Sequence, residues 1–397
     1  MNNHGGVVPF PPGIEHLVDT LYPPARQALA LEVASEGRRL FWIGTALQLA
    51  IYAALYFSGV SAALRSRVEG WTKRPFVVPF VVVSAVLLVS PVLMLPFTWY
   101  SSYVFEHHYG LSQESVSDWF YDWAVGAALS AGIGAGIGTL FFRLVQRRER
   151  VWPLIAAGLA IPLILTGSIL LPVVVEPLFN TYTPLPSSPL TRSILDLAAQ
   201  HGVHASNVYV FNLSKQETSA NAFVSGIGPS ERIALSDTLL RTFKPDETLY
   251  VTAHELGHYV HGDLWRGAFY GWVGVLIAIA FLYYVGAPVA RRWPAWSRGL
   301  SDPAALPLLL ASLALFGIAL QPIGNALSRQ IEHNADAFAA ANTHLGTAGV
   351  RAFARLGSQG LAPLHPSPAI VWYFYTHPPL DERIDYAARQ AGLTGAF

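Results

Sequence analysis

The chain has 397 residues, of which 52% are hydrophobic and 13% charged, and its formal net charge is zero. Soluble domains carry roughly a quarter charged residues, so this composition indicates a membrane protein. The neutral balance gives no reason to expect nucleic acid as a partner. The absence of cysteine excludes disulfides, thiolate metal ligands and a cysteine nucleophile.

Six uncharged stretches each reach the length of about 20 residues that a helix needs to cross a bilayer. They are residues 40–64, 76–104, 123–142, 151–175, 267–290 and 303–328. We therefore expect a mostly α-helical protein, a polytopic bundle of about six spans. The third stretch carries Gly132, Gly134, Gly136 and Gly138. Small residues four apart allow helices to approach closely, so we expect this stretch to pack against a neighbour.

The spans divide the chain into five parts. These are a polar N-terminal segment (1–39), a four-span membrane region (40–179), a polar insert (180–266), a two-span region (267–328) and a polar C-terminal segment (329–397). The first part lacks the apolar core of a signal peptide, so we expect insertion to rely on the first span.

The insert has the pattern of a small α+β unit. It predicts a helix over Thr191–His201 and short strands over Val208–Phe211 and Arg232–Leu235. A second helix is expected from Pro245, because a proline followed by two acids is typical of a helix start.

That second helix carries His-Glu-Leu-Gly-His at residues 254–258, a complete HExxH motif. His254 and His258 are four apart, so they project from one helix face toward one metal ion. Glu255 lies beside them and can act as the general base. Catalytic zinc takes three protein ligands and keeps one open position. The His of the metzincin extension is missing, because Leu264 stands in its place.

A carboxylate after the sixth span is the candidate third ligand. Glu332 and Asp336 are four apart, so Glu332 can bind the metal while Asp336 accepts a hydrogen bond from an imidazole. The HExxH precedes the fifth span and Glu332 follows the sixth, so an antiparallel pair of spans brings them to one membrane face. A solvated acidic face is the alternative. His333 is a second candidate ligand, and His261 and Asp263 lie nearby without an assigned role.

Two other segments contain residues that could take part in the reaction or bind a substrate. His377 precedes two prolines, with Arg383 six residues later, and either side chain near the metal could stabilise an oxyanion. The alternative is an ordinary turn. Asn221, Ala222 and Phe223 begin an extended segment whose free edge could bind a peptide by strand addition. A simple connecting strand is the alternative.

These residues, in this order, resemble the type I CAAX prenyl endopeptidases, integral-membrane zinc proteases of the gluzincin group. Further stretches that carry the resemblance are residues 95–97, 106–110, 176–180, 183–186, 219–223, 232–240, 328–338, 377–379 and 382–383. Eukaryotic members have an additional N-terminal span, and the polar start here points to a bacterial-type homologue.

The resemblance implies one zinc ion per chain, held by His254, His258 and Glu332, with Glu255 as base. It implies that Asn221 and His377 bind substrate and steady the transition state, supported by Arg383, in a chamber enclosed by membrane helices.

The resemblance also implies a substrate: C-terminal protein tails cleaved after a prenylated cysteine. Peptides or lipidated tails are therefore the expected partners, together with the bilayer. The alternatives are general degradation of misfolded membrane proteins, or a non-catalytic transporter or scaffold with a structural zinc. A structural site usually closes its fourth position with Cys or His, and the chain has no cysteine.

Two arguments disagree about membrane orientation. Lys and Arg cluster in the loops between spans one and two, three and four, and five and six. The positive-inside rule places such loops in the cytoplasm and the catalytic insert on the other side. The resemblance implies a metal site on the cytosolic face. We expect a multi-pass protein of the bacterial inner membrane whose metal site lies on the cytosolic face.

Overall fold

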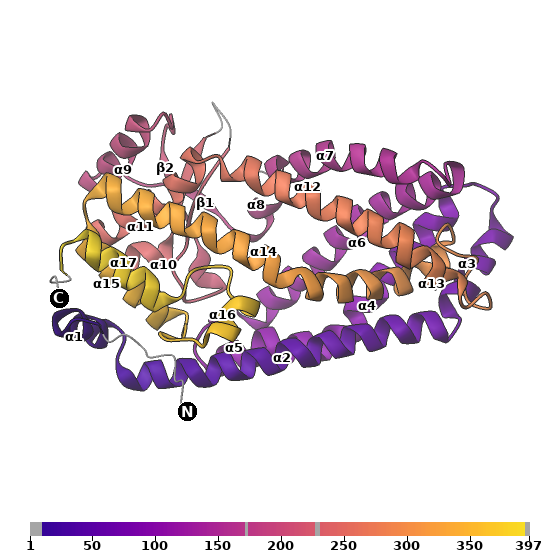
Figure 1. Cartoon of the computed structure of the whole chain (residues 1–397), viewed down its shortest axis with the longest axis horizontal. Helices are drawn as coiled ribbons and strands as arrows, with labels where there is room; N and C mark the ends of the chain where they lie inside the picture. The colour runs from indigo at the N-terminus through magenta and orange to yellow at the C-terminus, as the bar shows by residue number, and fades with distance from the viewer. Residues whose placement is uncertain (1–9, 171–173, 227–230, 394–397) are drawn as a thin grey trace.

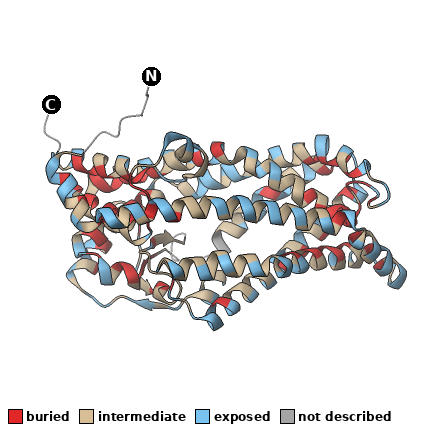
Figure 2. Cartoon of the chain, turned by 90° about the horizontal axis from the view of Figure 1, so that it is seen from below, coloured by how far each residue is buried: buried red, intermediate tan, exposed pale blue. Residues whose placement is uncertain are grey.

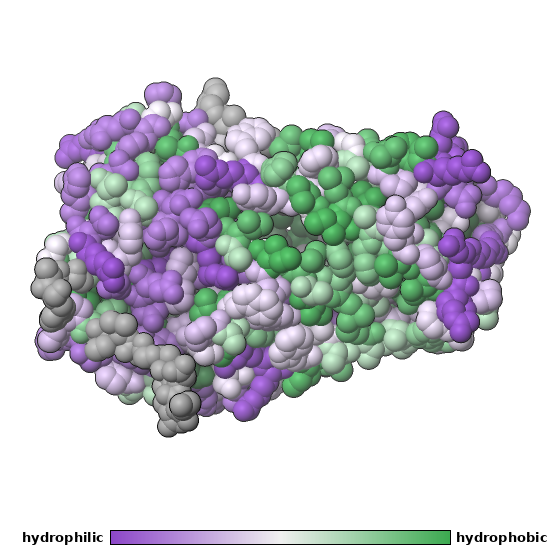
Figure 3. All heavy atoms as spheres, in the orientation of Figure 1, coloured by the Kyte–Doolittle hydropathy of each residue, from purple (hydrophilic) through white to green (hydrophobic). Residues whose placement is uncertain are grey.

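The computed structural model describes residues 10–170, 174–226 and 231–393. Long helices run along the long axis of the molecule, and a small sheet lies at one end among shorter helices (Figure 1). Apolar side chains cover the middle of the visible face, whereas polar side chains gather at both ends (Figure 3). The predicted fold class, a helical membrane bundle with a small α+β unit, is confirmed.

Five helices of the described chain are long and apolar enough to cross a membrane. They are α2 (Pro24–Phe57), α4 (Val77–Trp99) extended by η1 (Tyr100–Val104) and α5 (Phe105–His108), α6 (Val116–Arg147), α12 (Asp263–Phe281) extended by η5 (Leu282–Gly286) and α13 (Ala287–Arg291), and α14 (Leu306–Thr343). They coincide with five of the six predicted spans. α2 passes the expected boundary at residue 40 without interruption.

The fourth predicted span corresponds to α7 (Trp152–Leu170), an apolar helix of 19 described residues. Residues 171–173 of this predicted span lie outside the described part. α7 lies beside α12, where the Trp272 indole Nε1 donates to the Ala157 carbonyl over 3.0 Å.

The glycines of the third span pack as predicted on one face only. A Cβ at Gly134 would lie 2.6 Å from Leu87 Cδ1, and one at Gly138 would lie 2.9 Å from Val83 Cγ1. Both neighbours belong to α4, so these two positions allow α4 and α6 to touch. Gly132 and Gly136 have no neighbour within 4 Å.

The polar insert forms a four-stranded sheet with the order β1-β2-β4-β3. Its strands are β1 (Tyr182–Pro184), β2 (Val208–Phe211), β3 (Ala222–Ser225) and β4 (Arg232–Ser236). β2 and β4 pair in parallel, and the other two pairs are antiparallel. The predictions of β2 and β4 are confirmed, and β3 lies at an edge of the sheet.

Shorter helices surround the sheet or connect the spans. They are α1 (Pro12–Leu21), α3 (Val60–Trp71), α8 (Glu176–Phe179), α9 (Pro189–Gln200), η3 (Leu213–Lys215), α10 (Asp237–Thr242), α11 (Pro245–Val260), η6 (Pro303–Ala305), α15 (Gly346–Gln359), α16 (Pro368–Phe374) and α17 (Leu380–Gln390). The largest hydrophobic core joins α1, α9, the sheet, α11, α15 and α17. Buried residues are sparse in the middle of the long helices, the part that faces lipid in a membrane (Figure 2).

Candidate metal centre

The start of α11 is fixed by a buried carboxylate. The Lys244 backbone N–H donates to Glu247 Oε2 over 3.0 Å, as in a capping box. Glu247 is fully buried and pairs with two arginines of α15, Arg351 at 2.8 Å and Arg355 at 3.0 Å. These pairs anchor the helix that carries the HExxH motif.

Farther along α11, the motif packs directly against α14. A Cβ at Gly257 would lie 3.0 Å from Phe338 Cβ and 3.2 Å from Ala335 Cα, so glycine is needed for this close approach. The contact places Glu332 and Asp336 of α14 next to the two histidines. The predicted meeting of the HExxH helix with the segment after the sixth span is therefore present in the structure.

Three side chains converge on one point. His254 Nε2 lies 3.1 Å from His258 Nε2 and 3.2 Å from Glu332 Oε2, while His258 Nε2 lies 3.7 Å from Glu332 Oε1. Ligands at zinc-like distances in a tetrahedron lie about 3.3 Å apart. The three side chains could therefore share one metal ion.

The outer nitrogens of both imidazoles contact carboxylates. His254 Nδ1 lies 2.8 Å from Asp336 Oδ1, and His258 Nδ1 lies 3.0 Å from Asp263 Oδ2. When each Nδ1–H is donated to its carboxylate, both Nε2 lone pairs point to the same place. Glu332 Oε2 is buried there and accepts no hydrogen bond from any described residue. A set of acceptors that faces inward in this way fits a metal cation.

The carboxylates also set the charge of the site. Burial alone would lower the pKa of His254, but the adjacent carboxylates of Asp336 and Glu332 stabilise the imidazolium and raise it to about 9. Burial raises the pKa of the Glu255 carboxyl, against the opposing attraction of His254 and His258. A carboxyl with a raised pKa is suited to exchange a proton near neutral pH.

Arg383 reaches the site through Asp336. Its Nε and Nη2 donate to the two Asp336 oxygens over 2.8 and 2.7 Å, and its guanidinium lies 4.2 Å from the centre of the Phe353 ring. Asp336 is buried, and the Arg383 side chain is only 13% exposed. The structure therefore gives Arg383 direct contact with the carboxylate that holds His254.

His377 approaches the cluster from the C-terminal segment. Its Nε2 lies 3.3 Å from Glu332 Oε2, and its side chain is half exposed. His377 is thus placed at the open side of the candidate metal position, where an oxyanion could be reached.

The edge strand β3 packs on α11, the helix that carries His254 and His258. Asn221 precedes it with an exposed side chain, while its backbone N and O both bond to Ser236 over 2.9 Å. The Ala222 side chain is buried in the core, and the Phe223 ring packs on Phe211 at 5.5 Å. What remains for a ligand is the Asn221 side chain and the free backbone edge of β3.

Sequence reasoning gave no role to Asp263, which bonds His258. Asp263 is five residues after His258 and so does not share its face of a continuous helix. Gly262, in the left-handed region at φ 69°, separates the end of α11 from α12, which begins at Asp263. His333, the second candidate ligand, packs against Tyr386 at 5.2 Å and is outside the three-residue cluster.

Comparison with known proteins shows which families the chain matches. Residues 184–391 match peptidase family M48, and residues 33–181 match the CAAX prenyl protease N-terminal family of five membrane helices. The chain is 30% identical to the uncharacterized metalloprotease YhfN of Bacillus subtilis (strain 168), over 92% of this chain and 86% of the relative.

The chain is also similar to eukaryotic proteins and to a solved crystal structure. The chain is 30% identical to the CAAX prenyl protease 1 homolog of Arabidopsis thaliana, over 76% of this chain and 71% of the relative. The crystal structure of S. mikatae Ste24p has the same fold. It superposes with a TM-score of 0.71 at 22% identity, covering 95% of this chain and 90% of that one.

Proposed function

The chain belongs to peptidase family M48, and from this premise we propose that its metal is one zinc ion held by His254, His258 and Glu332. It is an integral, multi-pass membrane metalloendopeptidase. The zinc assignment is supported by the donor set, two imidazole nitrogens and a carboxylate, which is typical of catalytic zinc.

The residues around the metal would divide the work of peptide hydrolysis. When bound, zinc supplies a Lewis acid that acidifies water and polarises the scissile carbonyl. Glu255 takes the proton of the attacking water and delivers it to the leaving amine. His377 donates a hydrogen bond to the oxyanion that develops on the carbonyl. Asp336, held by Arg383, orients His254, and Asp263 does the same for His258.

The peptide would lie along β3. A free strand edge binds an extended peptide through main-chain hydrogen bonds, with Asn221 bonding the substrate backbone. The catalytic part would comprise both polar regions, 180–266 and 329–397, since Glu332 and His377 come from the second.

We propose lipidated C-terminal tails as the substrate class. The relatives named as CAAX prenyl proteases support a prenylated tail. The apolar belt of the molecule is hollowed between α12 and α14 (Figure 3), which would suit a hydrocarbon chain beside the peptide.

Matched peptides test this proposal. The purified full-length protein is incubated with one C-terminal peptide, farnesylated or unmodified at cysteine, and the products are identified by mass spectrometry. We expect cleavage after the cysteine and a rate at least ~10-fold higher for the farnesylated peptide, because the lipid adds apolar burial. Equal cleavage of both would instead support general degradation of membrane proteins. Glu255→Gln is the inactive control.

We further propose a bacterial inner membrane with the metal centre facing the cytoplasm, as the resemblance implies. The basic loops oppose this orientation, so it requires a direct test. The chain has no cysteine, so a single introduced cysteine reports the side of the membrane on which it lies. With Arg241→Cys near the metal centre and Arg148→Cys at the opposite end, an impermeant thiol reagent should label only Arg148→Cys in intact cells. Labelling of Arg241→Cys alone would show that the metal centre faces away from the cytoplasm.

A further inference from the structure

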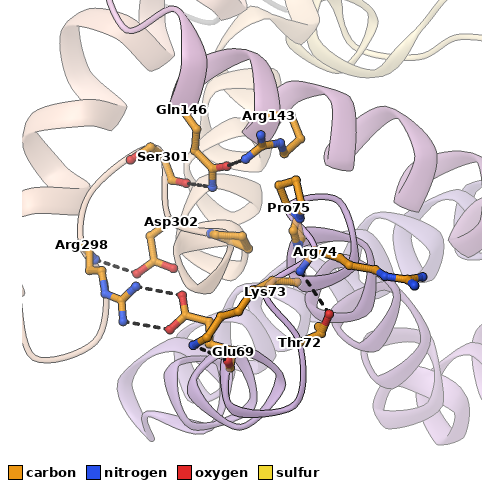
Figure 4. Close-up of a pocket in the computed structure, with 13 residues that line it drawn as sticks. Glu69, Thr72, Lys73, Arg74, Pro75, Arg143, Gln146, Arg298, Ser301 and Asp302 are labelled. Carbon is orange, nitrogen blue, oxygen red and sulfur yellow. Dashed lines mark hydrogen bonds and ion pairs between the residues drawn. The ribbon is translucent and has the colours of Figure 1, made fainter.

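A polar cavity lies at the end of the bundle opposite the metal centre. It has a volume of about 470 Å³. Its walls come from the end of α3 and the loop between α3 and α4, the end of α6 and the loop before η6. The side chains of Glu69, Gln146 and Asp302 lie around the space, whereas that of Arg74 extends away from it (Figure 4). A volume of this size is within the range of ligand-binding cavities.

Both acidic residues of the cavity already have cationic partners. Glu69 accepts two hydrogen bonds from Arg298, of 2.8 and 3.0 Å. Asp302 pairs with the buried Arg65 at 3.0 Å and also accepts from the Ala304 backbone N–H over 3.0 Å. Neither carboxylate is available to neutralise another cation.

Three further cations of the cavity form no ion pair with a carboxylate in the described part of the chain. The Lys73 ammonium donates to the Glu69 backbone carbonyl over 3.1 Å, and no bond or ion pair of the Arg74 guanidinium is found there. Arg143 donates to Gln146 Oε1 over 2.6 Å, but its Nε is buried without an acceptor. The cavity therefore has excess positive charge.

The rim of the cavity has the character of a membrane interface. Trp71 is 79% exposed, and Phe76 and Phe80 are also exposed beside it. Aromatic residues of this kind concentrate where hydrocarbon meets water. The guanidinium of Arg143 lies 5.2 Å from the centre of the Phe76 ring, so charge and apolar surface adjoin. A matching ligand must be both anionic and attached to hydrocarbon.

We propose that this cavity binds the phosphate headgroup of an anionic phospholipid. Lys73 would neutralise the phosphate together with Arg74 at the rim, and the Arg143 guanidinium would donate to one of its oxygens. The acyl chains would run down the exposed apolar faces of α4 and α6. Basic cavities between membrane helices are suited to such headgroups, because each Lys or Arg near the membrane surface attracts anionic lipid.

The test is lipid binding by native mass spectrometry of the full-length protein in detergent. The probes are dioleoyl-phosphatidylglycerol, dioleoyl-phosphatidylcholine and inorganic phosphate. Lys73→Gln combined with Arg143→Gln should weaken binding of the phosphatidylglycerol roughly 30-fold, about 5-fold for each charge. The matched control, Arg148→Gln with Arg150→Gln, removes the same charge from the same end outside the cavity and should change binding less than about 2-fold.

Three results would overturn the proposal. Equal weakening in both double variants would mean that only the general positive field attracts lipid. No preference of the wild type for phosphatidylglycerol over phosphatidylcholine would exclude an anionic headgroup. Inorganic phosphate binding as tightly as the phospholipid would assign the cavity to a soluble ligand. If the first variant does not fold, Lys73→Gln with Arg74→Gln, both on an exposed loop, makes the same comparison.

Discussion

The two ends of the helical bundle both gather charged side chains at the membrane boundary, but they balance charge differently. At the metal centre, the His254 imidazole pairs with the Asp336 carboxylate and the His258 imidazole with that of Asp263. Asp336 also pairs with Arg383. At the opposite end, the acids have cationic partners and cations remain in excess. A network in which each group has its partner holds side chains in fixed positions. An unbalanced cluster attracts a ligand from outside.

The largest expected effect tests whether peptide hydrolysis depends on the metal centre and not on the opposite end of the bundle. Glu255→Gln removes the proposed base without removing a ligand, so peptidase activity should fall about 10²–10⁴-fold. Metal content, measured by elemental analysis, should stay at that of the wild type. Arg148→Gln, at the other end, should retain activity within about 2-fold because only surface charge is lost. Hydrolysis by Glu255→Gln at the wild-type rate would contradict the mechanism.

A second pair of variants uses a feature that the two ends share, a buried Arg–Asp pair. Arg383→Ala and Arg65→Ala each leave a buried carboxylate without its partner, which costs about 3–5 kcal/mol of unfolding free energy. Equilibrium unfolding in denaturing detergent measures this loss. Metal affinity should fall in Arg383→Ala alone, because only Asp336 contacts a proposed ligand. A matching loss of metal in Arg65→Ala would show that the two ends are coupled.

Asp263 offers a narrower test of the metal network. Asp263→Asn keeps the size of the side chain but weakens the hydrogen bond to His258, and outer partners of this kind contribute about 10–100-fold to metal affinity. Competition with a fluorescent chelator measures the change. Glu69→Gln, which removes a carboxylate from the opposite end, is the control and should leave metal affinity unaltered. An unaltered affinity in Asp263→Asn would remove Asp263 from the network.

The smallest effect concerns helix packing. Gly257→Ala forces α11 away from Phe338 and Ala335, and such overpacking costs about 1–3 kcal/mol. Thermal unfolding should register this loss together with weaker metal binding, because the histidines move relative to Glu332. Gly271→Ala on α12, where a Cβ meets nothing within 4 Å, is the matched control. A variant at Gly257 as stable as this control would contradict the close approach.

Features that depend on local pattern were predictable from the sequence. Five spans follow from apolar length alone, and the geometry of His254, His258 and Glu332 follows from helical spacing plus one antiparallel pair of helices. The start of α2 was not identified, because a hydropathy window marks where hydrocarbon begins rather than where the helix begins at Pro24. Asp263 was given no role because its position depends on one left-handed residue, Gly262.

The cavity at the basic end shows another limit of sequence reasoning. The three basic loops were visible in the sequence, and an even number of crossings between them already places them on one side. Which cations would be neutralised was not visible, because Arg65–Asp302 and Arg298–Glu69 join residues more than two hundred positions apart. Long-range pairing decides which charges are left over.

The length of α14 has a consequence for where a substrate is cut. Its 38 residues form one helix about 57 Å long, whereas the hydrocarbon layer is about 30 Å thick. Glu332 lies about 40 Å along this helix from Leu306. The helix therefore holds the proposed zinc ligand at a fixed distance from the opposite end of the bundle. For a tail that is cut directly after its lipidated cysteine, the lipid must therefore lie close to the metal centre and not at the far end of this helix.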